Sequence, residues 1–225
     1  LIQEDGVSCT YTNSISLNGQ PNDMSSHDDL LVITTNNNIG LYRDGTRVGG
    51  LSMSEYGYGA TCVCMKTGGS QIAVGGDDNK THIYDVNAQS YTLTLATTIE
   101  TRSAVTALAY SHNGDMLAIG DAGRQIEVTN TTDWSMKVKG RWVFHSSKIT
   151  CLSWSPTDTY LASGSLDETI YIWNSNSVAE KKGIQFAHNG GVTGLAWIHN
   201  NDDNDNKLVS CGSDHTIVTW DRTKL

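Results

Sequence analysis

One segment of the chain occurs twice, and this repeat limits the possible folds more than any other feature. Leu161–Trp173 reads Leu-Ala-Ser-Gly-Ser-Leu-Asp-Glu-Thr-Ile-Tyr-Ile-Trp, and Leu208–Trp220 repeats its pattern without a gap. Each copy has an apolar start, a Ser, an Asp four residues later and a Trp six residues after that. Looser copies begin at Leu30, Ile72 and Leu117, so the five copies start 42, 45, 44 and 47 residues apart. A period in the forties, built from β-type residues, is typical of the blades of a β-propeller.

The composition agrees with one all-β domain over residues 1–225. A chain of 225 residues can bury a sizeable core, and it contains only 2 Pro but 22 Gly. The abundant Thr, Ser, Asn, Val and Ile favour short strands joined by tight turns. The sequence has no run of 18 or more apolar residues and does not open with a basic and then an apolar region. We therefore expect neither a membrane span nor a secretion signal.

Charge and cysteine content narrow the possible partners. The net charge is −9, and residues 1–100 carry −7 of it, from 4 basic and 11 acidic side chains. An acidic surface repels phosphate backbones, so no nucleic-acid partner is expected. The five cysteines are odd in number and lie mostly in apolar strand patterns, which indicates reduced thiols in an intracellular protein. Cys62 and Cys64 share one face of a strand, but no further pair stands at zinc spacing, so neither a metal nor a cofactor is expected.

Each repeat divides into short strands separated by turn residues. The fifth repeat reaches its third strand at Trp220 without an outer strand, whereas the predicted strand Val7–Tyr11 belongs to no repeat. We therefore expect residues 7–11 to complete the last blade beside Thr216–Trp220 and to close the ring. If the two segments lie apart, the chain is an arc of a larger propeller. The prediction is about five four-stranded blades, over residues 12–54, 58–100, 103–143, 145–187 and 188–225.

Two repeats carry the same four polar or aromatic side chains. A Ser, a His and an Asp could form a hydrolase triad, but no Gly-x-Ser-x-Gly elbow is present, and a triad is not expected twice at one period. The two repeats resemble the WD-repeat family, in which such a tetrad is a hydrogen-bonded network that satisfies buried polar groups. The resemblance therefore implies a structural role and no catalytic residue. The two sets are His145, Ser163, Asp167 and Trp173, and His188, Ser210, Asp214 and Trp220.

The other repeats depart from this tetrad. The second repeat keeps Asp78 and Tyr84 but has Val74 at the Ser position and no His at the expected place. The first repeat keeps only Asn36 and Tyr42. We expect apolar packing to hold these blades instead.

Beyond the WD pattern, five further segments of the sequence are informative: Gln71–Gly76, Ala104–Gly114, His145–Pro156, Gln185–His188 and Val192–Trp197. In these segments, and in their order and spacing over most of residues 60–225, the chain resembles the C-terminal propeller of the actin-interacting protein 1 family. Members of that family have two joined seven-bladed propellers, bind actin filaments decorated by cofilin or actin depolymerising factor, promote their disassembly and affect barbed-end capping.

The resemblance implies a non-catalytic, monomeric protein of the cytoplasm and the actin cytoskeleton, with actin filaments and cofilin as partners and no contact with membranes. The chain departs from the family plan, because it shows about five blades and no N-terminal propeller. The best-known actin contacts of the family lie in that absent half, so no actin-binding residue is carried over. The alternative is a WD-repeat adaptor scaffold for another protein complex, since propellers bind partners through loops.

A partner is expected at one rim of the propeller. In WD-type blades, the loop between the second and third strands opens on the same rim as the turn before the inner strand. The residue before the tetrad Asp then points outward along this rim. An exposed Leu beside a Lys is a common composition for a binding hot spot, although a lone surface Leu carries no meaning by itself. The candidate rim residues are Thr35, Asp77, Ala122, Leu166 and Ser213, joined by Lys148 and Asn189.

Overall fold

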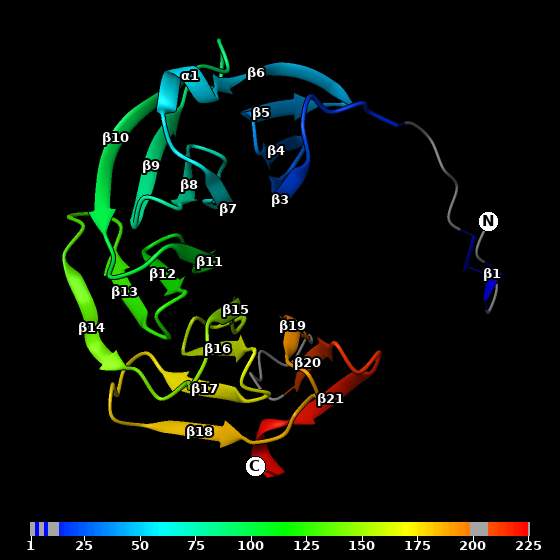
Figure 1. Ribbon diagram of the computed structural model, residues 1–225, viewed down its shortest axis with the longest axis vertical. Coiled ribbons are helices and arrows are strands. Elements are labelled where there is room, and N and C mark those ends of the chain that lie inside the picture. The colour runs from blue at the N-terminus through cyan, green and yellow to red at the C-terminus, as the bar shows by residue number, and fades with distance from the viewer. Residues whose placement is uncertain (1–2, 5–6, 9–13, 199–206, 225) are drawn as a thin grey trace.

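The computed structural model describes residues 3–4, 7–8, 14–198 and 207–224. Nearly all of the described regular structure is β-strand. The exceptions are the short helix α1 (Met53–Tyr56) and the 3-10 turn η1 (Arg222–Lys224). Apart from β1 (Gln3–Glu4) and β2 (Val7–Ser8), which pair with each other, the described strands form five antiparallel sheets, one for each repeat, which stand like blades around a common centre (Figure 1). The all-β propeller architecture predicted from the repeat is confirmed.

Within each blade the strands follow chain order. The first blade contains β3 (Pro21–His27), β4 (Leu30–Thr35), β5 (Asn38–Arg43) and β6 (Thr46–Ser52). The second contains β7 (Ala60–Met65), β8 (Gln71–Gly76), β9 (Lys80–Val86) and β10 (Leu93–Glu100). The third contains β11 (Val105–Tyr110), β12 (Met116–Asp121), β13 (Ile126–Asn130) and β14 (Met136–Trp142). The fourth contains β15 (Ile149–Trp154), β16 (Tyr160–Ser165), β17 (Ile170–Asn174) and β18 (Lys181–Ile184), and the fifth contains β19 (Val192–Trp197), β20 (Lys207–Gly212) and β21 (Ile217–Asp221).

The burial pattern explains why each strand takes its place. The second strands, such as β8 and β12, are almost wholly buried, because both of their faces are covered by neighbouring blades. They accordingly consist of small and aliphatic residues. The outer strand β10 is mostly exposed and buries only Leu93 and Ile99. Between the third and fourth blades, Trp142 stacks on Trp173 with ring centroids 4.9 Å apart. The core is therefore a series of apolar layers between successive blades.

A row of hydrogen bonds joins the blades around the centre. The donor is the side chain of the second residue of an inner strand, and the acceptor is the carbonyl of the first residue of the next inner strand. Thr106 departs from this pattern, because its hydroxyl donates to Gly120 O within its own blade, at 3.3 Å. The bonds between blades run from Asn22 Nδ2 to Ala60 O (2.7 Å), from Thr61 Oγ1 to Val105 O (2.6 Å) and from Thr150 Oγ1 to Val192 O (2.5 Å).

Replacing Thr150 by Val is expected to lower the free energy of unfolding by about 1 kcal/mol, because the variant keeps the side-chain shape but loses the short bond to Val192 O. Thr106→Val is the matched control and should have a smaller effect, since its bond is longer and joins no second blade. Urea titration measures both values. Equal decreases in the free energy of unfolding for the two variants would show that the bond between blades stabilises the fold no more than the bond within a blade.

The first and last blades do not close into a ring. The inner strands pack in the order β3, β7, β11, β15 and β19, and Figure 1 shows an arc with the first and fifth blades at its two ends. The strand β2 (Val7–Ser8) pairs with β1 (Gln3–Glu4), and β21 pairs only with β20 among the described strands. The fifth blade therefore has three described strands rather than four.

The predicted closure by residues 7–11 is therefore wrong for Val7–Ser8, and residues 9–11 lie outside the described residues. The physical reason is local. Glu4 faces Val7 across a short hairpin, and closing so small a loop costs less chain entropy than joining segments some 200 residues apart.

Candidate functional site

The fourth blade brings its four predicted tetrad residues together. Trp173 Nε1 donates to Ser163 Oγ at 2.8 Å, and Ser163 Oγ lies 2.8 Å from His145 Nε2. The other ring nitrogen of His145, Nδ1, lies 3.0 Å from Asp167 Oδ2. Because the carboxylate of Asp167 can only accept, Nδ1–H of His145 donates to it, and Nε2 accepts the hydroxyl hydrogen of Ser163, whose oxygen accepts the indole N–H. The chain of bonds joins the turn before β15 to β16 and β17.

The fifth blade repeats the network, but its aspartate is more exposed to solvent. Trp220 Nε1 donates to Ser210 Oγ at 2.8 Å, and Ser210 Oγ lies 2.7 Å from His188 Nε2. His188 Nδ1 lies 3.0 Å from Asp214 and also 3.1 Å from Thr216 Oγ1. The Asp214 side chain is 21% exposed, against 7% for Asp167. The second network therefore has more contact with water and a spare acceptor for the histidine.

Electrostatics in the fourth blade favour a neutral histidine beside a charged aspartate. Burial lowers the pKa of His145. Burial alone would raise the pKa of Asp167, but the N–H groups of Ser146 (2.6 Å) and Thr169 (3.0 Å) donate to its carboxylate and hold that pKa below its usual range. Ser163 is fully buried, and its hydroxyl oxygen accepts a hydrogen bond from the indole N–H of Trp173. Because it is buried, its hydroxyl is not accessible to a substrate. The arrangement has the order of a Ser-His-Asp relay but serves to fix the blade.

The second blade contains a different polar network, which the sequence analysis missed. Tyr58 stacks on His82 with ring centroids 3.8 Å apart, and its hydroxyl lies 3.0 Å from the hydroxyl of Tyr84. His82 Nε2 in turn lies 3.1 Å from Asp78 Oδ2. The apolar packing expected for this blade is present, and this polar network supplements it. The alternation of side chains along a strand could have indicated this network, since His82 and Tyr84 are two residues apart and share one face of β9.

The third blade also buries polar groups in place of a tetrad. Gln125 N donates to Asp121 Oδ1 at 2.8 Å, and Gln125 Nε2 donates to Glu127 Oε1 at 2.6 Å. All three residues are buried. Burial raises the pKa of both Asp121 and Glu127. Apolar packing is therefore supplemented by buried carboxyl groups here too.

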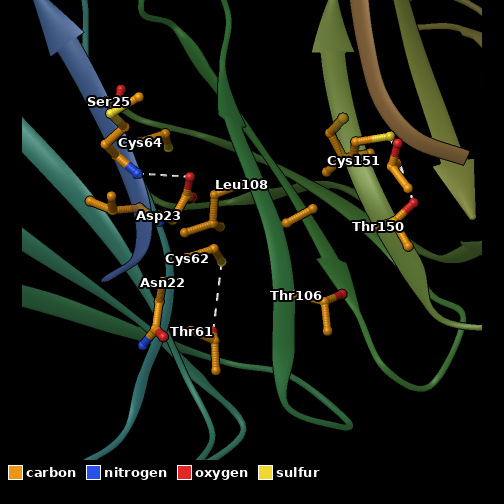
Figure 2. A pocket seen from close by; sticks show the side chains of 15 residues that line it. Asn22, Asp23, Ser25, Thr61, Cys62, Cys64, Thr106, Leu108, Thr150 and Cys151 are labelled. Carbon is orange, nitrogen blue, oxygen red and sulfur yellow. Dashed lines mark hydrogen bonds between the residues drawn. The ribbon is translucent and has the colours of Figure 1, made fainter. Parts of the chain in front are cut away.

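The inner strands line a polar central recess of about 440 Å³ (Figure 2). Asp23 Oδ2 accepts the N–H of Val63 at 2.9 Å and so ties the first blade to the second. Burial raises the pKa of Cys62 to about 12 and that of Cys151 to about 12, so both thiols stay protonated at neutral pH. No group of three His, Cys, Asp or Glu side chains that could hold a metal occurs in the described part of the chain. The recess is lined by hydroxyl, thiol and amide groups and by the carboxylate of Asp23.

The structure places most of the predicted rim residues at the surface. Leu166 is 41% exposed, and its N–H donates to Lys148 O at 3.3 Å, which sets the two residues side by side. Asn189 N donates to Asp214 Oδ2 at 3.1 Å, so this rim position is tied to the second tetrad. The exposed members of the predicted set are Asp77, Ala122, Leu166, Ser213, Lys148 and Asn189.

Thr35 is the exception, because it is fully buried. Its Oγ1 accepts the N–H of Asn38 at 3.0 Å. The turn between β4 and β5 has two residues, whereas the corresponding turn of the fourth blade has four, so counting along the repeat is out by one position here. Asn36 occupies the rim position instead, since its N–H donates to Gln20 O just as that of Leu166 donates to Lys148 O.

Comparisons with known proteins agree with this geometry. The family model described as "WD domain, G-beta repeat" matches residues 136–174 and 180–221. Actin-interacting protein 1-2 of Arabidopsis thaliana is 33% identical over 220 residues, which is 96% of this chain and 34% of that protein. Actin-interacting protein 1 of Caenorhabditis elegans is 30% identical over the same length, with the same two coverages.

A solved structure shows the same fold. A chain of the structure titled "Crystal Structure of Mitotic Checkpoint Complex" superposes with a TM-score of 0.75 at 20% identity, over 100% of this chain and 72% of that one. The blades, the two tetrads and the repeat match define a WD-repeat β-propeller protein. Within that class, the sequence similarity makes it an actin-interacting protein 1-like WD-repeat protein, as the resemblance predicted.

The chain spans about a third of the length of these curated relatives (34% of each). No helix in the described part of the chain is both long and apolar enough to cross a membrane.

Proposed function

We propose that this protein is a non-catalytic, monomeric actin-binding protein that promotes cofilin-dependent disassembly of actin filaments and affects barbed-end capping. It acts in the cytoplasm, at the actin cytoskeleton, with actin filaments and cofilin or actin depolymerising factor as partners. The observation that carries the proposal is the 33% identity to actin-interacting protein 1-2 over 96% of the chain. The arc of blades, open between the first and the fifth, supports the further proposal that they belong to a larger, seven-bladed ring.

The proposed contact with the filament is the rim between the second and third strands. Leu166 is 41% exposed beside the exposed Lys148. Ala187 N donates to Glu168 O at 2.8 Å, which holds Phe186, 83% exposed, close to the same turn. Two exposed apolar side chains beside a cation have the composition of a protein contact.

The double variant Leu166→Asp, Lys148→Glu is expected to weaken filament binding roughly fivefold or more, because it removes an apolar contact and reverses a charge. Co-sedimentation with actin filaments, with and without cofilin, measures binding, and circular dichroism checks the fold. The control variant Ala179→Asp, Lys139→Glu makes the same change in charge, and its two exposed positions, in the turn before β18 and on the outer strand β14, lie away from this rim.

Unchanged binding by the folded rim variant would remove this rim from the proposal. Failure of the unmodified chain to bind filaments under either condition would instead favour the adaptor for another complex.

A further inference from the structure

A second recess opens on the same rim, between the first and second blades. It encloses about 710 Å³. Its polar lining includes the side chains of Gln20, Asn36 and Asp77, and its apolar lining includes Pro21 and Met53, the latter 43% exposed. No Lys or Arg is among the residues that line it. The recess therefore combines one carboxylate and several uncharged polar groups with apolar side chains.

The carboxylate of Asp77 is held in a fixed position. Gly59 N donates to Asp77 Oδ1 at 2.8 Å, and Asp77 N donates back to Gly59 O at 3.0 Å. A Cβ atom at Gly59 would overlap Asp77 Oδ2, so the absence of a side chain lets the carboxylate lie against the backbone. Among the described residues, no Lys, Arg or His forms an ion pair with Asp77. One carboxylate oxygen is thus aligned at the recess without a cation.

The first blade repeats this arrangement with an amide. Gln20 N donates to Asn36 Oδ1 at 3.0 Å, and Asn36 N donates to Gln20 O at 3.1 Å. The corresponding rim positions of the third, fourth and fifth blades are Ala122, Leu166 and Ser213. At these equivalent positions of the described rim, an acid or amide side chain therefore occurs in the first two blades and not in the other three, and the first two blades belong to the half of the chain with a net charge of −7.

We propose that the recess between the first and second blades binds a Lys or Arg side chain of a partner protein, while a neighbouring apolar residue of that partner packs on Met53 and Pro21. An aligned carboxylate without a cation is complementary to an ammonium or guanidinium group, and such charge-assisted hydrogen bonds are among the strong ones. The volume is ample for a long basic side chain. The proposal rests on the proposed function in one respect, since it uses the same rim as the partner surface.

The test titrates the 15N-labelled chain with two peptides and follows the amide resonances. The probes are an acetyl-Leu-Arg-Leu amide and its uncharged counterpart with Gln in place of Arg. The Arg peptide is expected to shift the Gly59 and Asp77 resonances, and Asp77→Asn should weaken its binding about tenfold. Gly59→Ala keeps the charge but displaces the carboxylate, so it should also weaken binding. Asp28→Asn removes the same charge from the turn at the opposite rim and should leave binding unchanged.

Equal binding of the Gln peptide, unchanged binding by Asp77→Asn, or no shift up to about 10 mM peptide would each overturn the proposal. The failure of the proposed function is distinguishable, because the Leu166→Asp, Lys148→Glu variant changes the fourth blade only. If filaments fail to bind the unmodified chain but the Arg peptide still binds at Asp77, the proposed site for a basic side chain is supported and the proposed actin partner is rejected. If filaments bind and the peptide does not, the reverse holds.

Discussion

Asp167→Ala is expected to lower the free energy of unfolding by about 1–3 kcal/mol, and Asp214→Ala by clearly less. Removing Asp167 leaves the Nδ1 proton of the buried His145 without an acceptor, because among the described residues only this carboxylate lies within bonding distance of it. Removing Asp214 leaves His188 with the hydroxyl of Thr216 at 3.1 Å. Asp214 is also more exposed, so water can take its place. An unpaired buried donor costs about as much as its desolvation, which sets the larger value.

Urea titration followed by tryptophan fluorescence measures the free energy of unfolding of both variants, because the six tryptophans of the chain report on its unfolding. Ser146→Ala is the matched control: its exposed side chain is removed while its backbone N–H to Asp167 remains, so its stability should hardly change. Equal losses for the two aspartate variants would contradict the role given to Thr216. No loss for Asp167→Ala would contradict the network itself.

The blades and the two tetrads could be predicted because the repeats place the same residue types at the same spacing. The tetrads were recognisable because all four residue types stand at fixed spacing in both copies. The network of the second blade was not, because Tyr58 comes from the turn after α1 and bonds to Tyr84, a pairing that no tetrad spacing indicates. Its stacking on His82 depends on how that turn approaches β9, which is a property of packing between elements rather than of local order.

The two errors have a common physical source. Thr35 was placed on the rim by counting along the repeat, but a turn of two residues in the first blade moves Asn36 into that position. The predicted closure assumed that a free strand pairs with a free edge, whereas Val7–Ser8 pairs with its nearest neighbour along the chain. The spacing of the repeats predicts where the strands lie along the chain. The length of each turn and the pairing of neighbouring strands then determine which side chain lies at the surface.

The recess at Asp77 could not have been predicted at all. It forms where the turns of two blades and the start of α1 meet, and its lining comes from five separate segments between residues 20 and 77. Counting along the repeat placed Asp77 on the rim but did not indicate a recess beside it. Gly59, whose missing side chain makes room for the carboxylate, is one Gly among 22, and nothing in the sequence distinguishes it from the others.

Acidification from about pH 7 to about pH 5 is expected to destabilise the protein through its buried histidines. Burial lowers the pKa of both His145 and His82 below the value of about 6.5 that the unfolded chain has. Below that pH the unfolded state binds protons that the folded state does not. The histidine contribution to stability is therefore constant above about pH 6.5 and falls as the pH drops further, by up to about 1.4 kcal/mol per pH unit for each histidine. The lowered pKa of Asp167 acts in the same direction but only below its ordinary range near 3.8.

Three carboxyl groups act against this trend, so a matched variant is needed to see it. Burial raises the pKa of Asp23, Asp121 and Glu127, and each therefore takes up a proton more readily in the folded state, which favours folding as the pH falls toward 4. His145→Gln removes one histidine and leaves these carboxyl groups in place. The variant is less stable than the unmodified protein at about pH 7, and the difference in free energy of unfolding should shrink steadily below about pH 6.5, because only the unmodified protein loses the histidine contribution. A difference that stays constant between about pH 8 and about pH 5 would mean that His145 has the same proton affinity in the folded and unfolded states, contrary to its burial in the tetrad.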